Sequence, residues 1–127
     1  MNAHALAHAA YGQANTAQKH PRSAEYDVIS RITARLRRAV DARPASFTDL
    51  VEAMTENRRL WTELAIDLAS PGNALPAPLR LQLLQLAQFT LRHSEEVLAG
   101  RGDAVVLIDI NLAILRGLAG PGKGDPK

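Results

Sequence analysis

Apolar residues recur at three- and four-residue spacing in four separate segments, and this spacing constrains the fold more than any other feature. Since an α-helix has about 3.6 residues per turn, each segment would gather its apolar side chains on one helical face. No segment alternates cleanly between apolar and polar residues, as a half-buried strand would. The chain of 127 residues is long enough for one domain, and an aromatic content of 4% leaves aliphatic side chains to fill the core. The sequence therefore predicts an all-α fold, a small helical bundle.

Prolines, glycines and capping residues set the expected ends of four main helices, over residues 23–42, 46–69, 76–99 and 104–116. Ser23, Ser46 and Asp103 are the expected N-caps, because their side-chain oxygens can accept hydrogen bonds from the first backbone N–H groups of a helix. The connections are short, which predicts that neighbouring helices run antiparallel. The third helix has leucines on more than one face, which predicts a central position for it.

The two ends of the chain differ in composition from the predicted bundle domain, residues 23–118. Residues 2–11 are rich in alanine and predict a short N-terminal helix, joined to the bundle by a polar linker that ends at residue 22. Glycine, proline and lysine dominate residues 119–127, which we expect to form a disordered tail. No secretory signal or membrane-spanning stretch is visible, so we expect a cytoplasmic protein without membrane insertion.

Three residues of the second helix are candidates for contact with a partner. Asn57 and Arg58 interrupt its apolar stripe, and Trp61 is the only tryptophan of the chain. A buried amide needs hydrogen bonds, so Asn57 either satisfies a group inside the bundle or faces a ligand or partner. Arg58 can lay its stem along apolar surface and pair with a carboxylate, and Trp61 is typical of either a core or a binding surface.

The fourth helix is apolar around nearly its whole circumference, with Asp109 and Arg116 as a narrow polar strip. A bundle of this size seldom surrounds a helix on every side, so part of the surface is expected to meet the N-terminal helix, a second copy or another protein. Asn111 lies among the apolar positions and, like Asn57, needs a partner. The candidate partner-binding residues here are Ile108, Asn111, Leu112 and Leu115. We expect Ile108→Asp or Leu115→Asp to abolish partner binding while leaving helicity largely intact.

Charge is distributed unevenly, although the net charge is only +2. Basic residues dominate the segment over 19–43, and acidic residues dominate the next segment, over 44–70. This pattern is typical of electrostatic complementarity between neighbouring helices, and it also occurs in phosphate-binding faces. Arg31, Arg35 and Arg38 recur on one helical face and are the candidate RNA contacts. No aromatic residues interleave with them, so direct nucleic-acid binding is the less favoured interpretation.

The sequence contains none of the residue patterns that commonly support catalysis. The chain has no cysteine, which excludes disulfides, thiolate metal sites and a cysteine nucleophile. His4 and His8 have the spacing of helical metal ligands but lack a supporting carboxylate. His93, Ser94 and Glu95 are adjacent, so they would point in different directions on a helix rather than form a triad. We therefore expect no enzymatic activity, catalytic residue, metal, cofactor or small-molecule substrate.

Short segments spread along nearly the whole chain resemble the FlaF family of flagellar biosynthesis regulators. They are Ala9-Ala10-Tyr11, Glu25-Tyr26 through Ile32-Thr33, Asn57-Arg58-Arg59-Leu60-Trp61, Asn73-Ala74-Leu75-Pro76 with Leu79-Arg80, Phe89, His93-Ser94, Val97-Leu98, Asp109-Ile110-Asn111 and Arg116-Gly117-Leu118. Their order and spacing together carry the resemblance, and the tail beyond Leu118 departs from it.

This resemblance implies a non-enzymatic cytoplasmic protein that binds flagellin and promotes its synthesis and secretion, in opposition to or together with the translational regulator FlbT. The apolar surplus of the third and fourth helices suits a chaperone-like mode, in which an amphipathic flagellin helix lies in an apolar groove with Asn57 and Asn111 fixing its register. The alternative is a post-transcriptional regulator that touches flagellin mRNA through the arginines of the first main helix, alone or with FlbT. A purely structural part of the flagellum is a third, less favoured option.

Overall fold

The computed structural model describes residues 22–119, which form four α-helices packed together. They are α2 (Arg22–Asp41), α3 (Phe47–Ala69), α4 (Ala77–Leu98) and α5 (Val105–Ala119). The all-α prediction is confirmed, and the four expected helices begin and end within three residues of these bounds. The predicted N-terminal helix and linker lie outside the described residues, as does the predicted tail apart from Ala119, which is the last residue of α5.

Helix capping agrees with the sequence at two of the three expected positions. The Ser46 hydroxyl accepts a hydrogen bond from the Asp49 N–H at 3.2 Å, and Asp103 Oδ1 accepts one from the Val105 N–H at 3.0 Å. Ser23 was expected to precede its helix but lies inside α2, which begins at Arg22. Helix α4 begins after Pro76, whose missing N–H costs nothing in the first turn.

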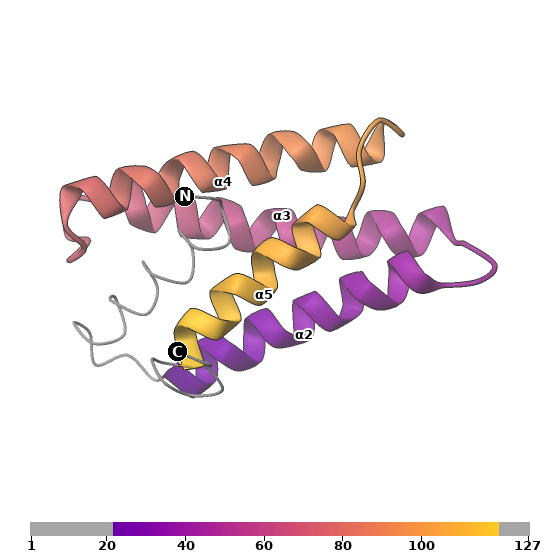
Figure 1. Cartoon of the computed structure of the whole chain (residues 1–127), viewed down its shortest axis with the longest axis horizontal. Coiled ribbons are helices and arrows are strands. Elements are labelled where there is room, and N and C mark those ends of the chain that lie inside the picture. Colours follow the sequence, from indigo (N-terminus) through magenta and orange to yellow (C-terminus); the bar gives the residue numbers. More distant parts are fainter. Residues whose placement is uncertain (1–21, 120–127) are drawn as a thin grey trace, which may run out of the picture.

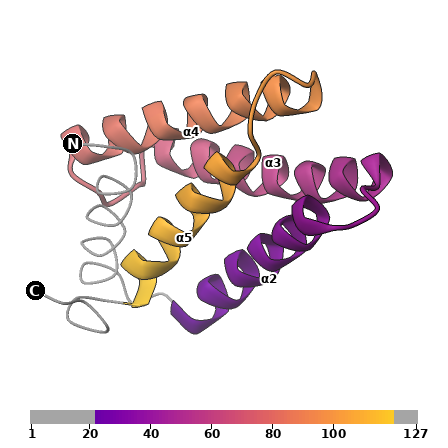
Figure 2. The same cartoon turned by 45° about the vertical axis from the view of Figure 1, so that its right-hand side comes forward.

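The helices α2, α3 and α4 follow one another up and down, and α5 then crosses back to α2 (Figures 1 and 2). Helix α3 packs against both α2 and α4, whereas α4 touches α5 only slightly. The predicted central position of α4 is therefore wrong, because α4 lies at the edge and leaves Leu81 exposed on its outer face. The short connections predicted that neighbouring helices run antiparallel, but α5 does not pack along α4, since the connection over 99–104 lets α5 turn towards α2.

The turn after α4 explains how this change of direction is made. Gly100 has a φ of +82°, a left-handed backbone conformation that side chains disfavour. Its N–H donates to the Val97 carbonyl at 3.0 Å, and the next N–H, of Arg101, donates to the Glu96 carbonyl at 2.8 Å. These two bonds satisfy carbonyls that the end of α4 would otherwise leave unpaired.

The core consists of two apolar clusters, and all four helices contribute to each of them. One cluster includes Trp61, Leu83 and Ile114, and the other includes Leu36, Met54 and Leu107. Five buried polar residues, which we call the polar belt, lie along the helices where one cluster gives way to the other. The polar belt consists of Thr33 in α2, Asn57 in α3, Thr90 and Ser94 in α4, and Asn111 in α5.

Candidate partner-binding site

A hydrogen-bonded amide network joins α3 to α5 inside the bundle. Asn111 Nδ2 donates to Asn57 Oδ1 at 2.7 Å, and Trp61 Nε1 donates to Asn111 Oδ1 at 3.0 Å. All three side chains are buried, and Asn57 is 0% exposed. Asn57 Nδ2 has no hydrogen-bond acceptor among the described residues. The network is therefore complete at Asn111 and incomplete at Asn57.

The sequence predicted that Asn57 and Asn111 each need a partner, and the structure shows that they are partners of each other. Helical spacing places a residue on its own helix, but it does not state which residue of another helix lies opposite. The interpretation of Trp61 as a core residue is confirmed, since its ring is buried and its indole is hydrogen-bonded. A direct contact between these three residues and another protein remains a prediction.

The other candidates on α5 do not form an open apolar face. Ile108 and Leu115 are buried and Leu112 is half-buried. Of the predicted polar strip, Arg116 is exposed and Asp109 is half-buried, and between 104 and 117 only Val105 and Arg116 are exposed. The expected unpartnered surface of this helix is thus absent over that range, because α5 lies against α2 and reaches α3 through its asparagine.

Arg58 lies half-buried on α3. We expected it to pair with a carboxylate, but no ion pair joins it to another residue between 22 and 119. Its stem can still cover apolar surface without that pairing.

A groove at one end of the bundle is the candidate site that sequence reasoning missed. It has a volume of about 660 Å³ and lies where the α2–α3 connection meets the α4–α5 connection. We call it the end groove, and its apolar lining consists of Ala39, Val40, Ala45, Phe47, Leu50, Val97 and Ala104. Phe47 is 67% exposed although it begins a helix whose other face is buried. Two connections far apart in sequence form this site, so no single segment could have indicated it.

Polar contacts hold the α4–α5 connection in place beside the end groove. The Arg101 guanidinium donates to both carboxylate oxygens of Glu96, at 2.8 and 3.2 Å. The hydrogen bonds and the opposite charge of Arg101 lower the pKa of Glu96 below its ordinary value. The same interactions raise the pKa of Arg101 above its ordinary value. His93 stacks on Phe89, and its Nε2 lies 3.0 Å from the Asp103 carbonyl oxygen. The α4–α5 connection, which forms one wall of the end groove, is therefore fastened to α4 at two points.

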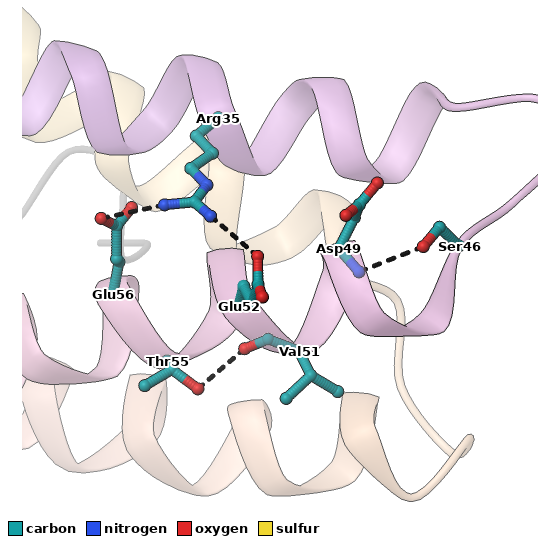
Figure 3. Close-up of polar contacts among 7 residues, drawn as sticks. All are labelled: Arg35, Ser46, Asp49, Val51, Glu52, Thr55 and Glu56. Carbon is teal, nitrogen blue, oxygen red and sulfur yellow. Dashed lines mark hydrogen bonds and ion pairs between the residues drawn. The ribbon is translucent and has the colours of Figure 1, made fainter.

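The candidate RNA contacts do not act as one uniform cationic face. Arg35 bridges Glu52 and Glu56 of α3, with both N–O distances at 3.1 Å (Figure 3). Arg31 and Arg38 are exposed on the same helix. The bridge confirms that the basic and acidic segments complement each other across neighbouring helices.

The described part of the chain also bears on two other site classes. No three His, Asp or Glu side chains between residues 22 and 119 gather closely enough to hold a metal ion, while His4 and His8 lie outside that range. Over the same residues, no helix combines the length and the apolar character needed to cross a membrane.

Four packed helices, a buried amide network and an apolar end groove define a small all-helical bundle protein. The family model described as flagellar protein FlaF matches residues 7–118. The chain therefore belongs to the FlaF family, a family of flagellar regulatory proteins and not of known enzymes, and has a role in flagellum biosynthesis. No curated protein and no solved structure matches the chain.

Proposed function

We propose that this protein is a non-enzymatic regulator that binds flagellin in the cytoplasm and promotes its synthesis, secretion and assembly. Membership of the FlaF family supports the flagellar part of this proposal. The observation that carries the binding part is the end groove, an apolar hollow of about 660 Å³ with Phe47 exposed in its lining. An exposed phenylalanine beside such a hollow is typical of a protein interface.

The end groove suits a chaperone-like contact with an amphipathic segment of flagellin. Helix-in-groove recognition inserts apolar side chains spaced three or four residues apart into an apolar groove. Val40, Phe47 and Leu50 supply such contacts from two helices. The polar lining groups Ser46 and Asp103 already bond within the protein, so affinity would come mainly from apolar burial.

The end groove is open to flagellin, whereas most of the contact residues proposed from the sequence are not. Asn57, Trp61, Ile108, Asn111 and Leu115 are buried, and Leu112 is half-buried, so their contact with flagellin would require α5 to move. Half-buried Arg58 is accessible without such movement. We therefore propose the end groove as the primary contact and keep these seven residues as a proposed second contact.

The test is calorimetric titration of the full chain with flagellin, comparing the wild type with Phe47→Ser and Ile66→Ser. Phe47 and Ile66 are both apolar residues of α3, exposed by 67% and 63%, and only Phe47 lines the end groove. We expect Phe47→Ser to weaken binding by about 1–3 kcal/mol, since an exposed anchor residue contributes to affinity and little to folding. Ile66→Ser should bind as the wild type does.

Equal losses from both variants would contradict the end groove as the site. Absence of wild-type binding would contradict flagellin as the partner. A flagellin without its terminal helices should not bind, and raising the salt concentration should have little effect on an apolar contact.

Binding of flagellin mRNA through α2, alone or with FlbT, is the second candidate function. It is favoured by the exposure of Arg31 and Arg38 and disfavoured by the two carboxylates that bind Arg35. RNA binding through several phosphates would weaken steeply between about 50 and 200 mM salt, so the same titration with RNA separates the two candidates.

A further inference from the structure

Two stripes of half-buried side chains run along α3 and α4 at a spacing of seven residues. Seven residues are close to two helical turns, so the members of each stripe lie on one face of their helix. We call the two stripes together the outer seam. It consists of Val51, Arg58 and Ala65 in α3 and of Leu84, Leu91 and Leu98 in α4.

The outer seam lies on the flank of the bundle that faces away from α5. In Figure 3, Val51 lies on the side of α3 that faces α4, and α5 passes behind these helices. On α4, His93 marks the side towards α5, because its Nε2 reaches the Asp103 carbonyl oxygen. Leu91 precedes His93 by two residues, a rotation of about 200°, so its side chain lies on the other side of α4. Within residues 22–119, α4 packs on α3 and touches α5 only slightly, so no third helix covers this flank.

The outer seam offers apolar surface along most of its length. Leu81, three residues before Leu84, continues the stripe of α4 and is 57% exposed. Val51 is half-buried but belongs to neither of the two core clusters. A helix that lay along the outer seam would remove these side chains from water, and this burial favours docking.

Arg58 occupies the middle of the outer seam and is its one charged member. The side chain is half-buried, and no ion pair joins it to another residue between 22 and 119. A helix docked on the outer seam would take the guanidinium out of water, and burying an unpaired charge is unfavourable. A carboxylate on the docked helix would compensate, because it can accept two hydrogen bonds from a guanidinium. Arg58 thus disfavours a purely apolar helix and favours one with an acidic residue in its apolar stripe.

The outer seam is continuous with the end groove through Phe47. This residue lines the end groove and lies one turn before Val51 on the same side of α3. Phe47 and Arg58 are eleven residues apart in α3, which corresponds to about 16 Å along the helix axis. A single helix can therefore contact both if its apolar anchor and its carboxylate are about three turns apart.

We infer that the outer seam is a docking surface for an amphipathic helix that carries a carboxylate about three turns from an apolar anchor residue, and that Arg58 selects for this carboxylate. The assignment of this helix to flagellin rests on the proposed function. The charge preference of the outer seam does not, and it can be measured with synthetic helices.

The test titrates the full chain with two synthetic amphipathic peptides that differ at one position. The acidic peptide has a glutamate in its leucine stripe, about three turns from a phenylalanine anchor, and the neutral peptide has leucine in place of that glutamate. The wild type is compared with Arg58→Leu and with Arg59→Leu as the matched control. Arg59 is the next residue along α3, exposed and outside the outer seam. Circular dichroism checks that both variants keep their helicity.

We expect the wild type to bind the acidic peptide at least about tenfold more tightly than the neutral peptide. Arg58→Leu should reverse this preference, and Arg59→Leu should keep it. Leu81→Ser should weaken the binding of both peptides, whereas Val105→Ser, at an exposed position on α5, should not. The inference is overturned if neither peptide binds the wild type, if the wild type binds both equally, or if Arg58→Leu still prefers the acidic peptide.

Flagellin titration of the same variants identifies the source of the helix. Weaker binding by Arg58→Leu but not by Arg59→Leu would support a flagellin helix in the outer seam. If the wild type does not bind flagellin, the proposed function fails, whereas the peptide titrations still decide the preference of the outer seam. If Phe47→Ser weakens flagellin binding and Arg58→Leu does not, the proposed function stands and the assignment of the docked helix to flagellin is overturned.

Discussion

At the scale of single residues, the pairing of Asn57 with Asn111 is the least expected feature of the molecule. Each asparagine could be recognised in the sequence as a polar residue in an apolar stripe. Their meeting depends on α5 crossing back to α2 instead of packing beside α4, and helical spacing within one segment contains no such information. The need for a partner was thus predictable, and the identity of the partner was not.

Asn111→Ala should destabilise the protein more than the loss of a surface residue would. The variant leaves the Trp61 indole N–H and Asn57 Oδ1 without partners in the core. Each buried unsatisfied group costs about 1–3 kcal/mol, so we expect the free energy of unfolding to fall by about 3 kcal/mol. Urea unfolding followed by the fluorescence of Trp61, the only tryptophan, measures this change. Thr90→Val should lose about 1 kcal/mol or less, and equal losses would argue against the cross-helix network.

At the scale of helices, the sequence predicted where elements begin and end better than how they pack. The Ser46 and Asp103 caps and the glycine after α4 are local signals, since each acts within a few residues of the backbone. Packing order is not local. Leucines on several faces of α4 suggested a central helix, yet α3 is the helix that lies between two neighbours, α2 and α4. The exposed side chains of Leu81 and Phe89 are the consequence.

Gly100→Ala tests the backbone conformation that ends α4 and begins the groove wall. A Cβ atom at Gly100 would meet nothing within 4 Å, so the only penalty is the positive φ of +82°. Left-handed backbone costs a non-glycine residue about 1–2 kcal/mol, and we expect the free energy of unfolding to fall by that amount. Gly72→Ala is the matched control, because it also has open space but no positive φ, and it should be neutral or slightly stabilising. Thermal unfolding of both variants measures the cost of the positive φ at Gly100, and equal losses would contradict it.

At the scale of the whole molecule, the apolar side chains that stabilise the fold are largely different from those that are open to a partner. The sequence correctly indicated one all-helical bundle, and it assigned the surplus of apolar residues on α5 to a partner surface. In the structure that surplus lies in the two core clusters, and the open apolar surface lies at the end groove instead. The total amount of apolar side chain was readable from the sequence. Its division between core and surface depends on where the connections place each helix.

This division reverses the expected outcome of placing a charge on α5. Ile108 and Leu115 are 3% and 7% exposed, so an aspartate at either position would bury an unpaired charge in an apolar cluster. Such a change costs several kcal/mol, which is a large share of the roughly 5–15 kcal/mol that stabilises a typical domain. We now expect Ile108→Asp and Leu115→Asp to lose helicity, measured by circular dichroism, together with flagellin binding. Val105→Asp, exposed at the start of the same helix, should keep its helicity. A folded Ile108→Asp protein that fails to bind flagellin would show that α5 leaves the core when the partner arrives, and would return Ile108 and Leu115 to the binding surface.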